Sequence, residues 1–160
     1  MIDNALDIAR SAALEAGEAI RGFYQDEYTV RDKGEDNPLT DADLAADKIL
    51  ENRLRSAFPD FGWLSEETAD TPERLDKTHV WIVDPLDGTR EFTLGIPEFV
   101  VSIGLVIDGK ATLGVLYNPI KDQLFTGVVG HGASLNGETI QVTTHQELQG
   151  SKVVCSRTEM

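Results

Sequence analysis

Two aspartates stand close together where a short apolar run ends. Residues 80–83 form the apolar run, which predicts a buried strand that Pro85 ends. Asp84 follows the run directly, and Asp87 comes three residues later, just before residues 88–89. The two carboxylates are expected to converge past a strand end, where backbone N–H groups are also unpaired. Carboxylates and free amides in one place suit a metal ion that holds an anion.

Two further acids are candidates for the same cluster. Asp43 stands at the start of a predicted helix, and Glu66 stands at the end of a predicted short strand. Each acid also has a structural explanation, because Asp43 completes a capping-box pattern with Thr40 and Glu66 ends a strand. Adjacent strand residues point to opposite faces, so at most one of Glu66 and Glu67 is expected to face a site with Asp84.

A cluster of three or four ionised carboxylates is electrostatically costly. Two like charges about 4 Å apart repel by roughly 4 kcal/mol at an effective dielectric constant of about 20. Such a cluster therefore needs divalent cations, or its members protonate. Oxygen ligands without His or Cys favour Mg²⁺, with Mn²⁺ as the alternative. Two such ions would activate a water for in-line attack on phosphorus, and the amides of Gly88 and Thr89 would bind phosphate oxygens.

The rest of the pattern predicts an α+β fold in which two N-terminal helices pack on a mainly antiparallel sheet. Helical spacing of apolar residues predicts helices over residues 3–24 and 41–58, the second capped by Thr40. Strands are predicted over residues 61–67, 99–107, 111–117, 124–129 and 139–142, with a new strand beginning at 151–156. Residues 25–39 are interpreted as a loop, residues 68–78 as a polar connector, and residues 130–137 as tight turns.

Composition excludes several classes of partner. The chain has 14 basic and 28 acidic residues in 160, a net charge of −14, so neither a nucleic-acid polymer nor an anionic membrane is an expected partner. No apolar run approaches the roughly 20 residues that span a bilayer. The single Cys155 cannot form an internal disulfide, which predicts a cytoplasmic location.

Four sequence stretches resemble one known family. Residues 84–92, DPLDGTREF, are similar to the signature of the inositol monophosphatase superfamily, the lithium-sensitive Mg²⁺-dependent phosphatases. PLTDAD (38–43), SEE (65–67) and VSIG (101–104) agree in order and spacing. The resemblance implies a phosphomonoesterase that hydrolyses a small phosphorylated metabolite by metal-activated water attack. It also implies the first domain of a layered αβαβα sugar-phosphatase fold, and it allows a homodimer.

By this resemblance, the acids become ligands of two or three Mg²⁺ ions. Glu66 and the carbonyl oxygen of Leu86 would bind the first metal. Asp84 would bridge two metals, and Asp87 would bind the second. Glu66 would thereby also serve catalysis.

The same resemblance implies how water and substrate are held. Asp43 and Thr89 would orient the attacking water, and the amides of Gly88 and Thr89 would hold the phosphate. Lys33 matches a loop lysine near the site. Ser65 and residues 90–92, REF, favour the 3′(2′),5′-bisphosphate nucleotidase branch over enzymes that act on inositol phosphates.

The chain departs from the family in one respect. Family members continue into a second domain, whose Trp-Asp motif supplies another carboxylate for the second metal. Neither Trp63 nor Trp81 is followed by Asp here. We expect residues 1–148 to form an N-terminal metal- and phosphate-binding domain and residues 149–160 to begin a truncated C-terminal α/β domain. These 160 residues alone are expected to have a weakened second metal site and little activity.

Two alternative functions remain open from the residues. One is a non-catalytic module that binds a metal or phosphate without turnover. The other is a phosphatase of the haloacid-dehalogenase type, which uses an aspartyl nucleophile. That class needs two acids two residues apart, whereas Asp84 and Asp87 are three apart, so it ranks lower.

Overall fold

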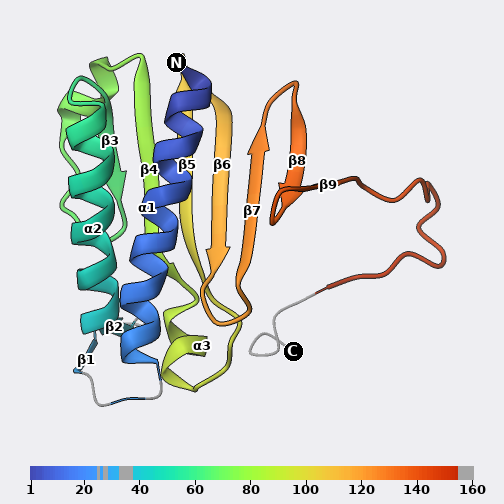
Figure 1. Cartoon of the computed structure of the whole chain (residues 1–160), viewed down its shortest axis with the longest axis horizontal. Coiled ribbons are helices and arrows are strands. Elements are labelled where there is room, and N and C mark those ends of the chain that lie inside the picture. The colour runs from blue at the N-terminus through green and yellow to red at the C-terminus, as the bar shows by residue number, and fades with distance from the viewer. Residues whose placement is uncertain (25, 27–28, 33–37, 155–160) are drawn as a thin grey trace.

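Two long helices cover one face of a seven-stranded sheet (Figure 1). The computed structural model describes residues 1–24, 26, 29–32 and 38–154. The helices are α1 (Ile2–Phe23) and α2 (Asp41–Ala57). The strands, in the order in which they lie in the sheet, are β3 (Gly62–Ser65), β4 (His79–Asp87), β5 (Val100–Ile107), β6 (Lys110–Asn118), β7 (Gln123–Val128), β8 (Gly132–Leu135) and β9 (Glu138–Ile140). β3 pairs in parallel with β4, and each later pair is antiparallel, which confirms the predicted α+β class.

The core lies between the helices and the sheet. Along β5, Val101, Ile103 and Leu105 are buried in alternation, as a strand with one covered face requires. On the opposite face of the sheet, Ile82 is 43% exposed and Leu116 is 41% exposed. The helices therefore bury one apolar face of the sheet and leave the other accessible over the described residues.

Small residues allow α1 to approach its neighbours closely. Five alanines of this helix are fully buried: Ala5, Ala9, Ala12, Ala13 and Ala16. At Gly17 a Cβ atom would overlap the ring of Tyr117. That ring is fixed at its hydroxyl, which accepts a hydrogen bond from Arg21 and donates one to Asp122. α1 thus packs directly against the end of β6.

The structure differs from the sequence prediction in the loop before α2. Residues 25–39 were expected to form a loop, but β1 (Val30–Asp32) and β2 (Pro38–Thr40) pair as a short antiparallel ribbon. Three-residue strands need backbone hydrogen bonds more than a buried face, so they leave no apolar alternation in the sequence.

A second difference concerns the residues predicted as tight turns. Part of that stretch is β8, which pairs with β7 and carries a hydrogen bond between the hydroxyls of Thr126 and Ser134. Asn136 (φ 49°) and Gly137 (φ 86°) form the two-residue turn into β9. Both left-handed positions suit a type I′ hairpin turn. The turn residues were identified correctly, but a four-residue strand between them is too short to be recognised by alternation.

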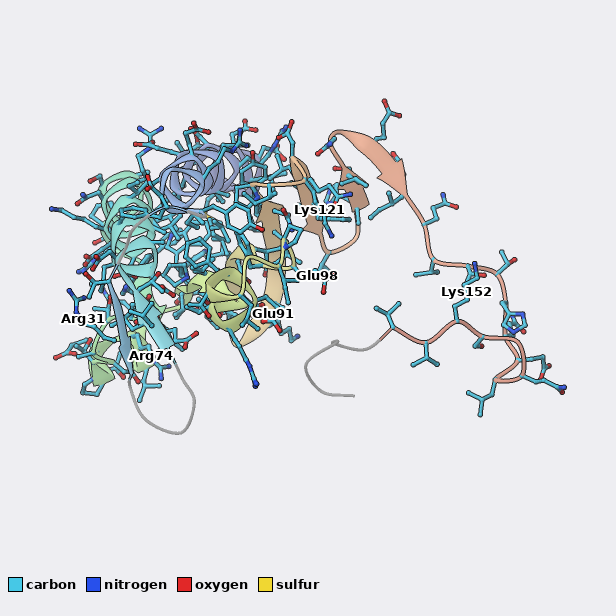
Figure 2. All side chains as sticks on the ribbon, turned by 90° about the horizontal axis from the view of Figure 1, so that it is seen from below. Arg31, Arg74, Glu91, Glu98, Lys121 and Lys152 are labelled. Carbon is cyan, nitrogen blue, oxygen red and sulfur yellow. The ribbon has the colours of Figure 1, made fainter. Side chains whose placement is uncertain are left out.

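The C-terminal segment also differs from its prediction. A strand was expected to begin at residue 151, but residues 151–154, the described part, have no regular structure. Val153 and Val154 are 84% and 94% exposed, and the segment that carries Lys152 extends away from the body of the molecule (Figure 2). An apolar pattern forms a strand only where another strand pairs with it.

In the connector before β4, the short 3₁₀ helix η1 (Pro72–Asp76) is an element that the sequence did not indicate.

A bilayer-spanning helix is absent from the described part of the chain, because no helix there combines the necessary length and apolarity.

Two glycines of α1 give a matched test of the close packing. A Cβ atom added at Gly22 would have no other atom within 4 Å, whereas one added at Gly17 would meet the fixed ring of Tyr117. We expect Gly22→Ala to raise the free energy of unfolding by up to about 1 kcal/mol, through helix propensity. Gly17→Ala should lower it, since overpacking typically costs about 1–3 kcal/mol. Urea denaturation measures both, and equal stabilisation by the two substitutions would contradict the packing argument.

Candidate metal and phosphate site

The strand that carries the two aspartates contains a bulge. Asp84 pairs with Ser102 of β5, and the next paired position is Asp87 with Val100. Two residues of β4 therefore stand opposite a single residue of β5, which defines a β-bulge. The prediction that Pro85 ends the strand is wrong, because β4 continues to Asp87. Proline has no N–H group to donate, and it occupies the place where the ladder is interrupted.

The bulge decides which way the second aspartate faces. In a regular strand, residues three apart point to opposite faces. One extra residue changes this alternation, so Asp84 and Asp87 share a face. Exposure agrees, since Trp81 and Val83 are buried beneath the helices while Ile82 and Asp87 are exposed. Both aspartates therefore lie on the face that α1 and α2 do not cover.

Glu66 joins this pair from the neighbouring strand. It directly follows β3, which runs parallel to β4, and its side chain is hydrogen-bonded to Asp84. Burial, then the charge and hydrogen bond of Glu66, then the charge of Asp87, raise the pKa of Asp84 to about 8. Burial and the charges of Glu66 and Glu91 raise the pKa of Asp87. Glu66 is thus close enough to both aspartates for its charge to oppose their ionisation.

The predicted water-orienting residues also meet. Asp43 is 1% exposed at the start of α2, and its Oδ1 lies 2.9 Å from the Oγ1 of Thr89. The same hydroxyl lies 2.9 Å from the carbonyl oxygen of Leu86. The other oxygen of Asp43 accepts hydrogen bonds from the backbone N–H (2.8 Å) and hydroxyl of Thr40, which completes the predicted capping box. Asp43 therefore caps α2 and also contacts the residue that follows Gly88.

Gly88 occupies a position that excludes any side chain. Its φ angle is +97°, in the left-handed region, and it precedes the short helix α3 (Thr89–Thr93). A Cβ atom would lie 2.9 Å from the carbonyl oxygen of Glu98 and 3.0 Å from the Cβ of Phe99. The first N–H groups of α3 have no acceptor within the helix, which leaves them for another partner.

One predicted site residue cannot be placed, and two further acids contact or influence residues of the candidate site. Lys33 lies outside the described residues. The sequence alone did not single out Glu91, whose charge raises the pKa of Asp87. It also did not single out Asp47, which accepts a hydrogen bond from the hydroxyl of Ser65. The signal for Asp47 was its spacing of four residues from Asp43, which places both acids on one side of α2.

The chemistry of the donor set fits Mg²⁺. Among the described residues, no group of three or more His, Cys, Asp and Glu side chains has the geometry to hold a metal ion. The paired carboxylates of Glu66 and Asp84, with the Leu86 carbonyl, nevertheless supply oxygen ligands alone. Mg²⁺ is commonly bound by one or two carboxylates together with water and phosphate. A divalent cation would also offset the repulsion that raises the pKa of Asp84.

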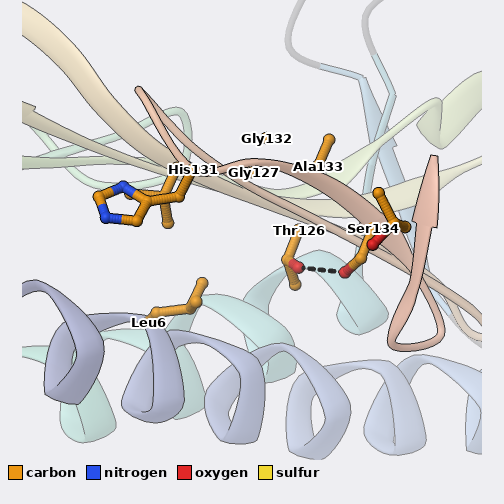
Figure 3. Close-up of a pocket in the computed structure, with 9 residues that line it drawn as sticks. Leu6, Thr126, Gly127, His131, Gly132, Ala133 and Ser134 are labelled. Atoms are coloured by element: carbon orange, nitrogen blue, oxygen red, sulfur yellow. Dashed lines mark hydrogen bonds between the residues drawn. The ribbon is translucent and has the colours of Figure 1, made fainter. Parts of the chain in front are cut away.

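A separate hollow lies far along the sheet from these acids. It has a volume of about 180 Å³ and lies between α1 and the β7–β8 hairpin, lined by Leu6, Thr126, His131 and Ser134 among others (Figure 3). The hydroxyls of Thr126 and Ser134 already bond to each other at 2.8 Å, and the ring of His131 bonds to a backbone carbonyl. Its polar groups are therefore largely satisfied within the fold.

Known proteins resemble the chain over almost its whole length. The model of the inositol monophosphatase family matches residues 1–159. Inositol monophosphatase 3 of Solanum lycopersicum is 45% identical over 150 residues, which are 92% of this chain and 56% of that protein. Extragenic suppressor protein suhB of Bartonella henselae superposes with a TM-score of 0.82 at 41% identity, over 87% of this chain and 54% of that one.

A third relative is also a bacterial protein of known structure. CysQ of Bacteroides thetaiotaomicron, described as a bacterial member of the inositol monophosphatase family, has a TM-score of 0.72 at 36% identity. That match covers 91% of this chain and 53% of CysQ. The chain therefore spans about half the length of the relatives that it matches.

Removing the charge of Asp84 should stabilise the metal-free protein at pH 8. The folded-state pKa of Asp84 is about 8 against 3.8 for the free side chain, so the folded state holds a proton that the unfolded state lacks. Stability contributed by this group is therefore complete below about pH 4 and is lost as the pH rises through 8. Asp84→Asn should show less of this loss, and it should also lose stabilisation by Mg²⁺.

Thermal unfolding at pH 6 and pH 8, with chelator or with Mg²⁺, measures both effects. Asp60→Asn is the matched control, since Asp60 is exposed in the turn before β3. Equal stabilisation of parent and Asp84→Asn by Mg²⁺ would contradict a role for Asp84 at the metal.

Proposed function

This chain belongs to the inositol monophosphatase family, and we propose that the whole protein is a Mg²⁺-dependent phosphomonoesterase acting on a small phosphorylated metabolite. The observation that carries the proposal is the hydrogen-bonded pair of Glu66 and Asp84 beside Asp87, on an accessible face of the sheet. Such a cluster of oxygen ligands has little structural value without a cation. The family match spans residues 1–159 and therefore includes all three acids of the cluster.

In this proposal, the acids and one carbonyl hold the metal. Glu66 and the Leu86 carbonyl would bind one Mg²⁺, Asp84 would contact two, and Asp87 would bind the second. When bound, Mg²⁺ would lower the pKa of a ligand water and neutralise charge on the phosphate. The backbone N–H of Leu86 donates to Oδ1 of Asp84 at 3.2 Å, which holds that carboxylate in place.

Asp43 and Thr89 would orient the attacking water. A hydroxyl has one proton and two lone pairs. When Thr89 donates its proton to Asp43, a lone pair of its oxygen is free to accept a proton from water. Asp43 is buried and fixed by Thr40, so the direction of this relay is set by the start of α2.

The phosphate would lie at the start of α3. The N–H groups of Gly88 and Thr89 would donate to its oxygens, and the glycine lets the backbone approach closely. Lys33 would add a positive charge, in keeping with its match to the family motif. A cytoplasmic location and the absence of a polymer or membrane partner belong to the same proposal, which is compatible with a homodimer.

The substrate class is an inositol phosphate or a 3′(2′),5′-bisphosphate nucleotide. Ser65 before Glu66 favours the nucleotide, as do residues 90–92, whereas the relative from Solanum lycopersicum is named an inositol monophosphatase. A phosphate-release assay of the whole protein would compare inositol 1-phosphate, adenosine 3′,5′-bisphosphate, fructose 1,6-bisphosphate and histidinol phosphate. We expect Mg²⁺-dependent release that Li⁺ inhibits. Tight Mg²⁺ and phosphate binding without release from any substrate would favour the non-catalytic module instead.

Asp43→Asn tests the water-orienting role against simple capping. The amide oxygen can still accept from the Thr40 N–H, so the cap is largely kept and stability should change little. The amide nitrogen would instead donate to Thr89 and occupy its lone pair. We expect kcat to fall by about 100-fold or more, the usual worth of a positioned proton acceptor.

Steady-state kinetics and urea denaturation of the same preparation separate these effects. Asp41→Asn is the control, because Asp41 is in the same helical turn and its carboxylate bonds to Thr29 at the surface. A loss of activity no larger than that of the control would exclude Asp43 from the proton relay.

A further inference from the structure

Asp47 makes two hydrogen bonds on the side of α2 that faces the end of β3. It lies one helical turn after Asp43. Its Oδ1 accepts from the hydroxyl of Ser65 at 2.6 Å, and its Oδ2 accepts from the hydroxyl of Thr68 at 3.0 Å. Ser65 is 5% exposed, so the first bond lies inside the fold. A helix residue thus holds a segment 18 to 21 residues further along the chain.

The two hydroxyls stand on either side of the predicted metal ligand. Ser65 precedes Glu66, and Thr68 follows Glu67. The Ser65 hydroxyl also accepts from the backbone N–H of Glu67 at 3.3 Å, while the N–H of Glu66 donates to the Val83 carbonyl of β4 at 3.2 Å. The backbone around Glu66 is therefore fixed from two directions, by β4 and by Asp47.

This bracing acts where the chain leaves the sheet. β3 ends at Ser65, and the bond from the Glu66 N–H to Val83 is made just beyond this end of the strand. The side chain of Glu66 is exposed, and packing does not fix its direction. Its hydrogen bond to Asp84 consequently depends on where the backbone of this short segment is held.

We propose that Asp47 is a positioning residue, whose bonds to Ser65 and Thr68 hold Glu66 in the place where it binds metal together with Asp84. The inference rests on the proposed function for the role of Glu66 as a metal ligand. Residues that orient a metal ligand typically contribute about 10–100-fold to metal affinity or activity. Asp47 itself contacts neither metal nor substrate in this scheme.

Mn²⁺ binding to the whole protein, measured by calorimetry without substrate, tests the proposal apart from activity. Asp47→Ala removes both bonds and should weaken Mn²⁺ binding by about 10–100-fold. Asp47→Asn keeps an amide that can accept from one hydroxyl and donate to the other, so it should restore most of the affinity. Glu51→Gln, one turn further along α2 in a surface pair with Arg55, is the control and should bind as the parent does.

A second readout is the Mg²⁺ concentration that gives half-maximal phosphate release. Asp47→Ala should raise it while kcat at saturating Mg²⁺ falls much less, because a positioning residue affects occupancy of the metal site first. Thr68→Val in the Asp47→Ala background should add little, since the two changes remove the same bond. If Asp47→Ala fails to fold in a thermal melt, Thr68→Val removes one bond at the margin of the connector and should still weaken Mn²⁺ binding.

Three results would overturn the proposal. Mn²⁺ binding by Asp47→Ala equal to that by Glu51→Gln would show that Glu66 binds metal without the hydrogen bonds to Asp47. Asp47→Asn as weak as Asp47→Ala would show that the charge acts and the hydrogen bonds do not. With Asp47→Ala unfolded, parental Mn²⁺ binding by Thr68→Val would count equally against it. Weakened Mn²⁺ binding in a protein that releases no phosphate would support the positioning role while rejecting the phosphatase.

Discussion

One extra residue in β4 creates the arrangement on which the carboxylate cluster depends. Without the bulge, Asp84 and Asp87 would point to opposite faces of the sheet, one of them into the apolar layer beneath the helices. With the bulge, both face away from that layer and lie near Glu66, which directly follows the adjacent parallel strand. The electrostatic cost appears in the raised pKa values of Asp84 and Asp87. Perturbed carboxylates of this kind cluster at functional sites, where a cation or substrate offsets the cost.

The N-terminal half of α2 is the frame that connects the separate parts of this cluster. Asp43 contacts Thr89, at the start of α3, and Asp47 contacts Ser65, at the end of β3. The two acids are one helical turn apart, so a single rigid element sets the distance between the water-orienting residue and the segment of Glu66. Asp43 also caps the helix through Thr40, so its side chain is already held in one conformation. The contact with Thr89 therefore requires no further loss of conformational entropy from this side chain.

Close packing of α1 keeps this frame in place. Its buried alanines and Gly17 bring the helix against α2 and β6 without large side chains between them. The hydroxyl of Tyr117 is fixed by Arg21 and Asp122, so this contact has little freedom to shift. A site on packed helices and strands holds its side chains more precisely than one on loops alone. The face of the sheet opposite the helices, with Ile82 and Leu116 exposed, leaves the carboxylates accessible.

The sequence by itself determined the fold class, the two helices, the cap at Thr40 and the acids that cluster. These features depend on local periodicity, on capping and on the DPLDGTREF motif, and each of these patterns involves residues that are close together in the sequence. The tertiary structure alone decided that β4 passes Pro85 through a bulge, and that Asp47 reaches Ser65 and Thr68. A bulge is defined by the register of two strands, and the Asp47 bonds join residues far apart in the chain. Neither leaves a local pattern, because both depend on which elements become neighbours when the chain folds.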